Sequence, residues 1–256
     1  ATEVVVKIMI YEGKETMLNS WLTKIPIAHR GLHDAISPEN SMSAFAKAIE
    51  HGYAIEMDVQ VTKDGVPLVF HDDSLERMTE LKGDIREKNF NEICDATLRR
   101  SEEKIPLLSE FLDFVNGRTP VLLEVKDHKN IGKAEEIIKE TLGDYKGDIA
   151  LQSFNPFIVR WFKQNTLYPV GTLSSFFKNV PMASWKKALL KNLVLLKYCK
   201  ADFVSYEYHD GRDFEKLKSL RGKLPVLFWT VDSAPEAENC KDACDNIIFE
   251  NFLPRI

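Results

Sequence analysis

Eight short apolar runs recur between residues 25 and 249, separated by helical patterns or by connections long enough to hold a helix. We interpret the runs as strands: IPIAH (25–29), YAIEMDV (53–59), PVLLEVK (120–126), IALQSF (149–154), VGTLS (170–174), DFVSYEY (202–208), PVLFWTV (225–231) and NIIF (246–249). Such alternation implies parallel strands with right-handed crossovers. At this length a (β/α)8 TIM barrel fits best, and an open doubly wound sheet is the structural alternative.

Caps and helix breakers predict where several of the intervening helices begin and end. Ser37 is expected to cap a helix whose first residue is Pro38 and which Gly52 ends. Other helices are expected over residues 107–115 and 214–220, after Asn155-Pro156, and in a segment that Gly143 ends.

One segment, VQVTKDGVPLVFHDD (residues 59–73), departs from this alternation. Its Asp64-Gly65 pair lies between two alternating apolar runs and predicts a β-hairpin with a two-residue turn after the second strand. In that register Asp58 pairs with His71, and directly opposed residues point to the same face. The hairpin is therefore expected to return His71 to the side of the sheet that carries Asp58.

The chain shows no linker rich in Pro, Gly or Ser, so residues 25–256 are expected to form a single TIM-barrel catalytic domain. Residues 1–24 are assigned to an N-terminal extension. Two interpretations of it stay open: an accessory strand over Val4 to Ile10, or added residues 1–16 ahead of an original start at Met17.

Composition excludes some classes of partner. The net charge of −5 gives no basic footprint, so we expect no nucleic-acid partner, and an anionic substrate must meet a local cluster of cations. No apolar run approaches the ~18 residues of a membrane span, so no stable membrane insertion is expected. The four cysteines form no metal-binding pattern, which is typical of a reduced, cytoplasmic protein.

A lysine-bearing segment follows the fifth strand and leaves an alternative open. Lys186, Lys187, Lys191, Lys197 and Lys200 alternate there with Trp185, Leu189, Leu193 and Leu196. A basic amphipathic helix can lie on a membrane, but a barrel helix with a solvated face is favoured at this position. Phe176 and Phe177 precede it, either as walls for an apolar part of a substrate or as packing residues.

Three carboxylates are expected to meet at the barrel mouth. Glu56 and Asp58 are two apart on one strand and so share a face, and Glu124 ends a neighbouring strand. Two such charges about 4 Å apart repel by roughly 4 kcal/mol at an effective dielectric of 20. A divalent cation would remove that repulsion, and an all-oxygen set favours Mg²⁺ or Ca²⁺. The alternative is that the carboxylates form salt bridges with Arg30 or Lys126.

His29 and His71 are the histidines expected to lie beside these carboxylates. One can act as general base and the other as general acid, although a histidine at a strand end is often a hydrogen-bonded structural residue. His33 and His128 are expected to be solvated, and His209 is a weaker candidate. Arg30 and Lys126 add positive charge suited to a phosphoryl group.

These residues lie in blocks that resemble the glycerophosphodiester phosphodiesterase family. The blocks are HRG and PENS, IEMDVQVTKDGVPLVFHDDSLERMT, IPLLSEFLDFV, LLEVK, LQSF and FWTVD, in the family's order from about Ile25 to Pro254. The resemblance implies a (β/α)8 barrel with a small insertion after strand two. It also implies roles: His29 and His71 as the acid–base pair, Arg30 binding phosphate, Glu56, Asp58 and Glu124 holding the cation, Lys126 beside the phosphate and Trp229 lining the pocket. Departures are Ser41, where threonine is frequent, and Asp232, where asparagine is common.

The function that this resemblance implies is cleavage of a small glycerophosphodiester to glycerol 3-phosphate and an alcohol, with one divalent cation, Mg²⁺ or Ca²⁺. One alternative is a phosphodiesterase that acts on lysophospholipids, like a lysophospholipase D. Another is a non-catalytic barrel that binds phosphodiesters, and a third is an unrelated metal-dependent isomerase or aldolase. The headgroup, the metal, the first nucleophile and the oligomeric state are left open.

Overall fold

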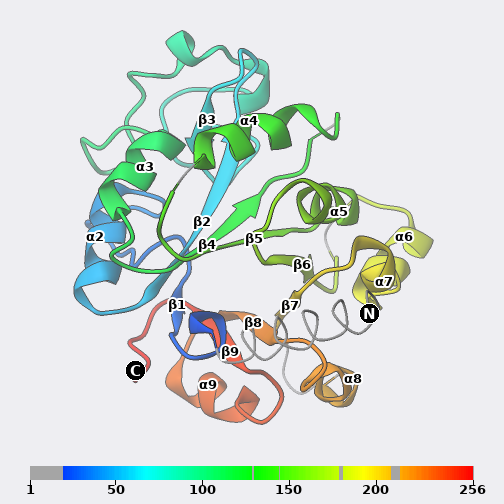
Figure 1. The fold of residues 1–256 in the computed structure, drawn as a ribbon. Helices are drawn as coiled ribbons and strands as arrows, with labels where there is room; N and C mark the ends of the chain where they lie inside the picture. The colour runs from blue at the N-terminus through cyan, green and yellow to red at the C-terminus, as the bar shows by residue number, and fades with distance from the viewer. Residues whose placement is uncertain (1–19, 129, 144, 179–180, 209–213, 256) are drawn as a thin grey trace.

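Eight parallel strands close into a barrel in the computed structural model, which describes residues 20–255 except 129, 144, 179–180 and 209–213 (Figure 1). They are β1 (Ile27–Ala28), β2 (Ala54–Val61), β4 (Val121–Val125), β5 (Ile149–Ser153), β6 (Val170–Ser174), β7 (Phe203–Glu207), β8 (Val226–Val231) and β9 (Asn246–Phe249). Because β1 pairs with both β2 and β9, the sheet has no break between its first and last strands. The TIM barrel is therefore confirmed, and the open-sheet alternative is wrong.

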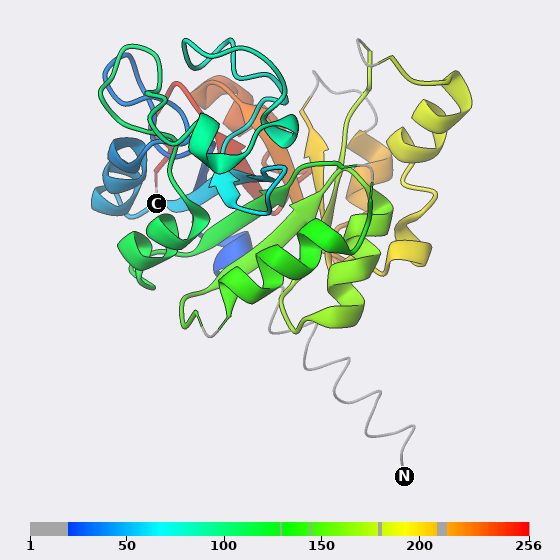
Figure 2. The same ribbon diagram turned by 90° about the horizontal axis from the view of Figure 1, so that it is seen from above.

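Helices cover the outside of the barrel between successive strands (Figures 1 and 2). They are α2 (Met42–Glu50), α3 (Leu108–Val115), α4 (Lys133–Leu142), α5 (Pro156–Asn165), α6 (Ser184–Lys191), α7 (Leu196–Cys199), α8 (Phe214–Leu220) and α9 (Ala234–Cys240). The expected lysine-bearing helix is divided into α6 and α7, and α6 buries none of its side chains. Within the described residues, no helix combines the length and apolar character that crossing a bilayer requires.

The predicted start of α2 at Ser37 is wrong. Ser41 caps the helix, because its hydroxyl accepts a hydrogen bond from the backbone N–H of Ala44 at 3.2 Å. Residues 37–40 instead form a loop, in which the Asp34 carboxylate accepts from the N–H of Ser37 at 2.9 Å. Asn40 takes a left-handed φ of 56°. This loop directs Asn40 toward the barrel mouth and not along an outer helix.

Apolar side chains fill the end of the barrel opposite the carboxylates. The cluster comprises Leu22, Ile27, Ala54, Leu122, Ala150, Phe203, Leu227 and Ile248. Leu22 belongs to a short 3-10 helix, η1 (Trp21–Thr23), and is only 1% exposed. Residues just before the assigned domain start at 25 thus pack into the barrel, whereas Val4 to Ile10 and Met17 lie outside the described residues.

The predicted hairpin is present, but its predicted register is wrong by one residue. Strand β3 (Pro67–Val69) runs antiparallel to β2, and Gln60 pairs with Leu68. The turn has three residues and not two, because the N–H of Thr62 donates to Val66 O and that of Gly65 donates to Thr62 O, both at 3.0 Å. Gly65 has φ +91°, which completes a turn followed by a bulge.

The insertion after β2 is also larger than a hairpin. Residues 70–105 contain two 3-10 helices, η2 (Ile85–Glu87) and η3 (Phe90–Glu92). They share an apolar core with β3, formed by Leu68, Phe70, Leu75, Ile85, Ile93, Leu98 and Ile105. Figure 2 shows these teal loops gathered along the upper side of the molecule.

Gly31 allows the chain to turn directly after the end of β1. Its φ is +78°, and a Cβ there would lie 2.9 Å from the carbonyl carbon of Ala44 and from the Phe45 ring. We expect Gly31→Ala to lower the free energy of unfolding by about 2–4 kcal/mol, since the left-handed backbone and the clash both cost energy. Gly222→Ala is the control, because Gly222 has φ +82° with nothing within 4 Å of the added atom. Urea denaturation of both variants checks this, and equal losses would contradict the contribution of the clash.

Candidate active site

The three predicted carboxylates form one buried cluster at the barrel mouth. Glu56 and Asp58 lie on β2, and Asp58 is in register with Glu124 on β4. One oxygen from each lies within 4.8 Å of the others, and all three side chains are buried. The sequence spacing therefore predicted this grouping correctly.

Two cations contact this cluster, as the salt-bridge alternative expected. Lys126 Nζ lies 2.6 Å from Glu124 Oε1 and 2.7 Å from Asp58 Oδ1, and Arg30 Nε lies 3.5 Å from Asp58 Oδ2. Burial alone would raise the pKa of Asp58, but Lys126, His71 and Arg30 outweigh it and hold that pKa below its usual range. Asp58 is therefore an anion at neutral pH.

Glu56 is less well compensated than Asp58. Its Oε2 accepts a hydrogen bond from the backbone N–H of Arg30 at 2.9 Å. Burial, followed by repulsion from Asp58 and Glu124, raises the pKa of Glu56 well above its ordinary value. Three buried carboxylates face only two cations, and this excess of negative charge on oxygen ligands fits a hard divalent cation such as Mg²⁺ or Ca²⁺.

His29 lies at the end of β1, where its backbone N–H continues the ladder to Phe249 O at 2.9 Å. Its Nδ1 lies 2.7 Å from Oε2 of Glu250, which follows β9. Burial lowers the pKa of His29, and the nearby Arg30 guanidinium adds to this, while Glu250 opposes it. The net effect favours a neutral His29 imidazole at neutral pH.

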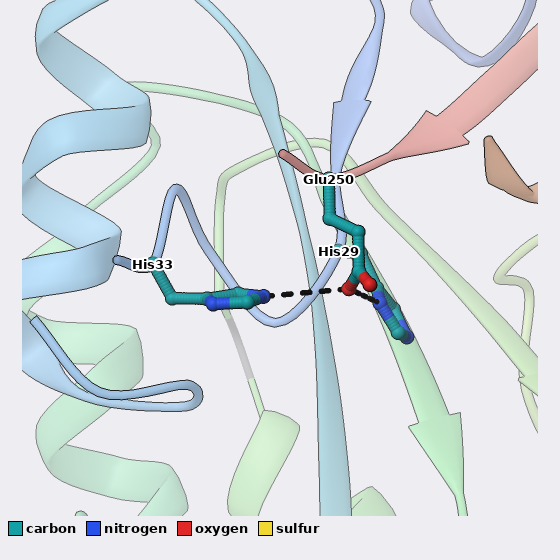
Figure 3. Close-up of side chains that lie close together, drawn as sticks. All are labelled: His29, His33 and Glu250. Atoms are coloured by element: carbon teal, nitrogen blue, oxygen red, sulfur yellow. Dashed lines mark hydrogen bonds and ion pairs between the residues drawn. The ribbon is translucent and has the colours of Figure 1, made fainter. Parts of the chain in front are cut away.

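Glu250 holds a second imidazole on its other side (Figure 3). His33 Nε2 lies 3.4 Å from the same Oε2 atom, and the His33 side chain is 22% exposed. His33 is therefore only partly solvated and is paired with a carboxylate, and the same holds for His128, whose Nε2 lies 3.0 Å from buried Glu135. His209 lies outside the described residues.

His71 follows β3 and reaches the acid cluster despite the shifted register. The backbone N–H of Phe70, and not that of His71, donates to Asp58 O at 3.0 Å. His71 nevertheless interacts electrostatically with Asp58 and lines the same cleft as Glu124. Its Nδ1 lies 2.6 Å from Asp72 Oδ1. Each candidate catalytic histidine is thus paired with a carboxylate.

Glu39 and Asn40 are two site residues that sequence reasoning missed. Glu39 Oε1 accepts from Nη1 of Arg30 at 2.8 Å and from Nη2 of Arg77 at 2.6 Å. Asn40 donates from Nδ2 to Asp58 Oδ2 at 2.9 Å. Both belong to the PENS segment, which was assigned to the outer helix. Glu39 therefore orients the Arg30 guanidinium, and Asn40 orients the Asp58 carboxylate.

A cleft of about 940 Å³ extends from the acid cluster between the hairpin and the β4–α4 connection. The residues that line it include His71, Glu124, Lys126 and Phe154. Its lining also includes three further cations, Lys63, Arg86 and Lys133. Trp229 is not among the described residues that line this cleft, but its ring centroid lies 5.5 Å from that of Phe154, and the Phe177 ring lies 6.1 Å from Phe154. Both rings contact the part of the cleft wall formed by Phe154.

Comparison with known proteins gives one family match. The model of the glycerophosphoryl diester phosphodiesterase family matches residues 29–252. A glycerophosphodiester phosphodiesterase of Caldanaerobacter subterraneus is 34% identical over 240 residues, which cover 88% of this chain and 93% of that protein. A Bacillus altitudinis enzyme of the same name is 37% identical over 135 residues, which cover 49% of this chain and 54% of that enzyme. The chain thus spans about half the length of some curated relatives.

Solved structures show the same fold. An Oleispira antarctica phosphodiesterase, determined in complex with the product sn-glycerol 3-phosphate, superposes with a TM-score of 0.71 at 22% identity. The alignment covers 88% of this chain and 93% of that one. A Thermotoga maritima glycerophosphodiester phosphodiesterase gives 0.68 at 23% identity and covers 88% and 94% of the two chains.

Proposed function

The chain belongs to the glycerophosphoryl diester phosphodiesterase family, and we propose that it hydrolyses glycerophosphodiesters to glycerol 3-phosphate and an alcohol. The observation that carries this proposal is the acid cluster, which is accompanied by two cations and two carboxylate-paired histidines. A site that only bound phosphodiesters would need the cations but no acid–base pair. The product named in the Oleispira antarctica complex agrees with the proposed reaction.

In this proposal Glu56, Asp58 and Glu124 hold one divalent cation, Mg²⁺ or Ca²⁺. A bound cation would supply Lewis acidity toward the nonbridging phosphate oxygens. Arg30 binds the phosphate from one side, held in place by Glu39, and Lys126 adds a point charge beside it. Trp229 is proposed to support the substrate pocket from beside it, where its ring contacts Phe154 of the pocket wall.

His29 and His71 move the protons of an in-line displacement. His29 is suited to accept the proton of the attacking hydroxyl, because its lowered pKa keeps Nε2 available while Nδ1 donates to Glu250. His71 then protonates the oxygen of the leaving alcohol, with its ring oriented by Asp72. The attacking hydroxyl belongs either to water, which gives glycerol 3-phosphate directly, or to the glycerol, in which case a cyclic phosphate forms and water opens it to glycerol 3-phosphate in a second step.

A coupled assay for released glycerol 3-phosphate, run over several headgroups, tests this function. Glycerophosphodiesters with small headgroups are expected to release glycerol 3-phosphate in the presence of Mg²⁺ or Ca²⁺. Turnover of long-chain lysophospholipids alone would favour the lysophospholipase D-like alternative. Tight binding without release of either product would favour a non-catalytic barrel.

Glu250 is proposed to position His29 and to hold its tautomer. We expect Glu250→Gln to lower kcat/KM about tenfold or more, since the carboxylate no longer fixes the ring that transfers the proton. Glu250 raises the pKa of His29, so the limb of the pH–rate profile that belongs to His29 should move to lower pH. The other charged or titratable neighbours of the pair stay unchanged in this variant. They are Arg30 and Asp58 beside His29, and Asp232 and His33 beside Glu250. Glu250→Asp, which keeps the charge, should retain the limb near its wild-type position, and an unmoved limb in Glu250→Gln would contradict the assignment.

A further inference from the structure

His29 and His33 each direct an imidazole nitrogen toward the Glu250 carboxylate (Figure 3), and one ligand atom from each of the three residues lies within 4.8 Å of the others. We propose that they form a second cation site, for a transition metal such as Zn²⁺, and that its occupation inhibits the enzyme. The inhibitory part rests on the proposed role of His29, whereas binding of the metal does not. The site differs from the acid cluster in both ligands and exposure.

The arrangement of the ligand atoms suits a tetrahedral ion. Zinc bonds of 2.0–2.1 Å place ligand atoms about 3.4 Å apart in a tetrahedron. His33 Nε2 and Glu250 Oε2 are already 3.4 Å apart. His29 Nδ1 and Oε2 are 2.7 Å apart, so they would have to separate by about 0.7 Å when the ion replaces the hydrogen bond. Three protein ligands leave a fourth position open to water.

The chemistry of the donors separates this site from the acid cluster. Two nitrogens and one oxygen suit Zn²⁺, whereas the three carboxylates suit Mg²⁺ or Ca²⁺. The side chains of His29, His33 and Glu250 are 15%, 22% and 26% exposed, so an ion can reach them from solvent. Hydrogen bonds from the two histidines hold the pKa of Glu250 below its usual range, and burial favours neutral His29. Metal binding requires these two protonation states.

Inhibition follows from the two nitrogens of one ring. The neutral His29 imidazole carries one proton, on Nδ1 when it donates to Glu250. An ion bound to Nδ1 leaves that proton on Nε2, with no net gain or loss of protons. Nε2 can then no longer accept the proton of the nucleophile, so the base that we assign to His29 is lost.

Titration with Zn²⁺ in the presence of saturating Mg²⁺ tests binding, with isothermal calorimetry as the readout. Wild type should bind one Zn²⁺ per chain under these conditions, and His33→Ala should weaken that binding at least about tenfold. His33→Asn is a second variant in case alanine disturbs the loop. His128→Ala is the matched control, because His128 also pairs with a carboxylate but lies elsewhere on the barrel. It should bind Zn²⁺ like wild type.

Steady-state assays of the same proteins test the inhibition. Zn²⁺ should inhibit wild type and His128→Ala, and added Mg²⁺ should not relieve it, while His33→Ala keeps its Mg²⁺-supported activity and resists Zn²⁺. Equal Zn²⁺ affinity in wild type and in both His33 variants would overturn the proposed site. So would binding that Mg²⁺ competes away. Zinc binding that depends on His33 in a protein without phosphodiesterase activity would instead reject the proposed function and leave the site intact.

Discussion

Replacing His71 by alanine is expected to lower kcat for glycerophosphodiester hydrolysis by about 10²–10⁴-fold, because the general acid assigned to the leaving oxygen is lost. The His71 side chain is 32% exposed, and its Nδ1 contacts Asp72. Removing it therefore leaves no buried cavity, and the midpoint of urea unfolding should remain close to that of wild type. Steady-state kinetics with equal amounts of folded protein give the measurement.

His51→Ala is the matched control for this prediction. His51 follows α2 at the surface, and its Nδ1 bonds only to the carbonyl oxygen of Lys47 among the described residues, at 2.9 Å. The same substitution there should leave kcat within a factor of about two. A His71→Ala enzyme with near-wild-type turnover would remove His71 from the proposed mechanism.

Glu56→Gln is expected to weaken cation binding without lowering the stability of the fold. The fold raises the pKa of Glu56 above its value in the unfolded chain. This carboxyl therefore lowers the free energy of unfolding at every pH above its unfolded pKa. The amide removes that cost, so the cation-free variant should be as stable as wild type or more stable at pH 7. Its affinity for Mg²⁺ or Ca²⁺ and its kcat/KM should each fall by about 10²-fold or more, since a ligand is lost.

Thermal unfolding with and without added cation measures both effects of Glu56→Gln. Wild type should be stabilised by the cation, and the variant should not respond in the same concentration range. Glu102→Gln, at an exposed site in the insertion, is the control and should respond like wild type. A destabilised Glu56→Gln variant that still binds the cation would contradict the ligand assignment.

The barrel could be predicted because its strands are buried on both faces and so read as uninterrupted apolar runs. Polar residues within such runs are conspicuous, which is why Glu56, Asp58 and Glu124 could be grouped from the sequence alone. The period of two along a strand places Glu56 and Asp58 on one face. Parallel pairing then brings Glu124 beside Asp58.

Glu250 could not be found in the same way, because it lies 221 residues after His29 and meets it only when β9 pairs with β1. Loop conformations were also beyond sequence patterns. Ser37-Pro38 matches a helix start, but the Asp34 carboxylate bonds to the backbone there and the helix begins after Ser41. In the hairpin, Thr62 Oγ1 accepts from the N–H of Val66 at 2.9 Å and stabilises a three-residue turn.

A cation held by Glu56, Asp58 and Glu124 is proposed to support hydrolysis of a glycerophosphodiester. The most direct measurement is the initial rate of glycerol 3-phosphate release from one small-headgroup substrate, before chelation, after chelation, and after Mg²⁺ or Ca²⁺ is returned. Release should stop on chelation and recover when one of these cations is restored. Undiminished release in excess chelator, or a phosphorylated headgroup with free glycerol as the products, would contradict it.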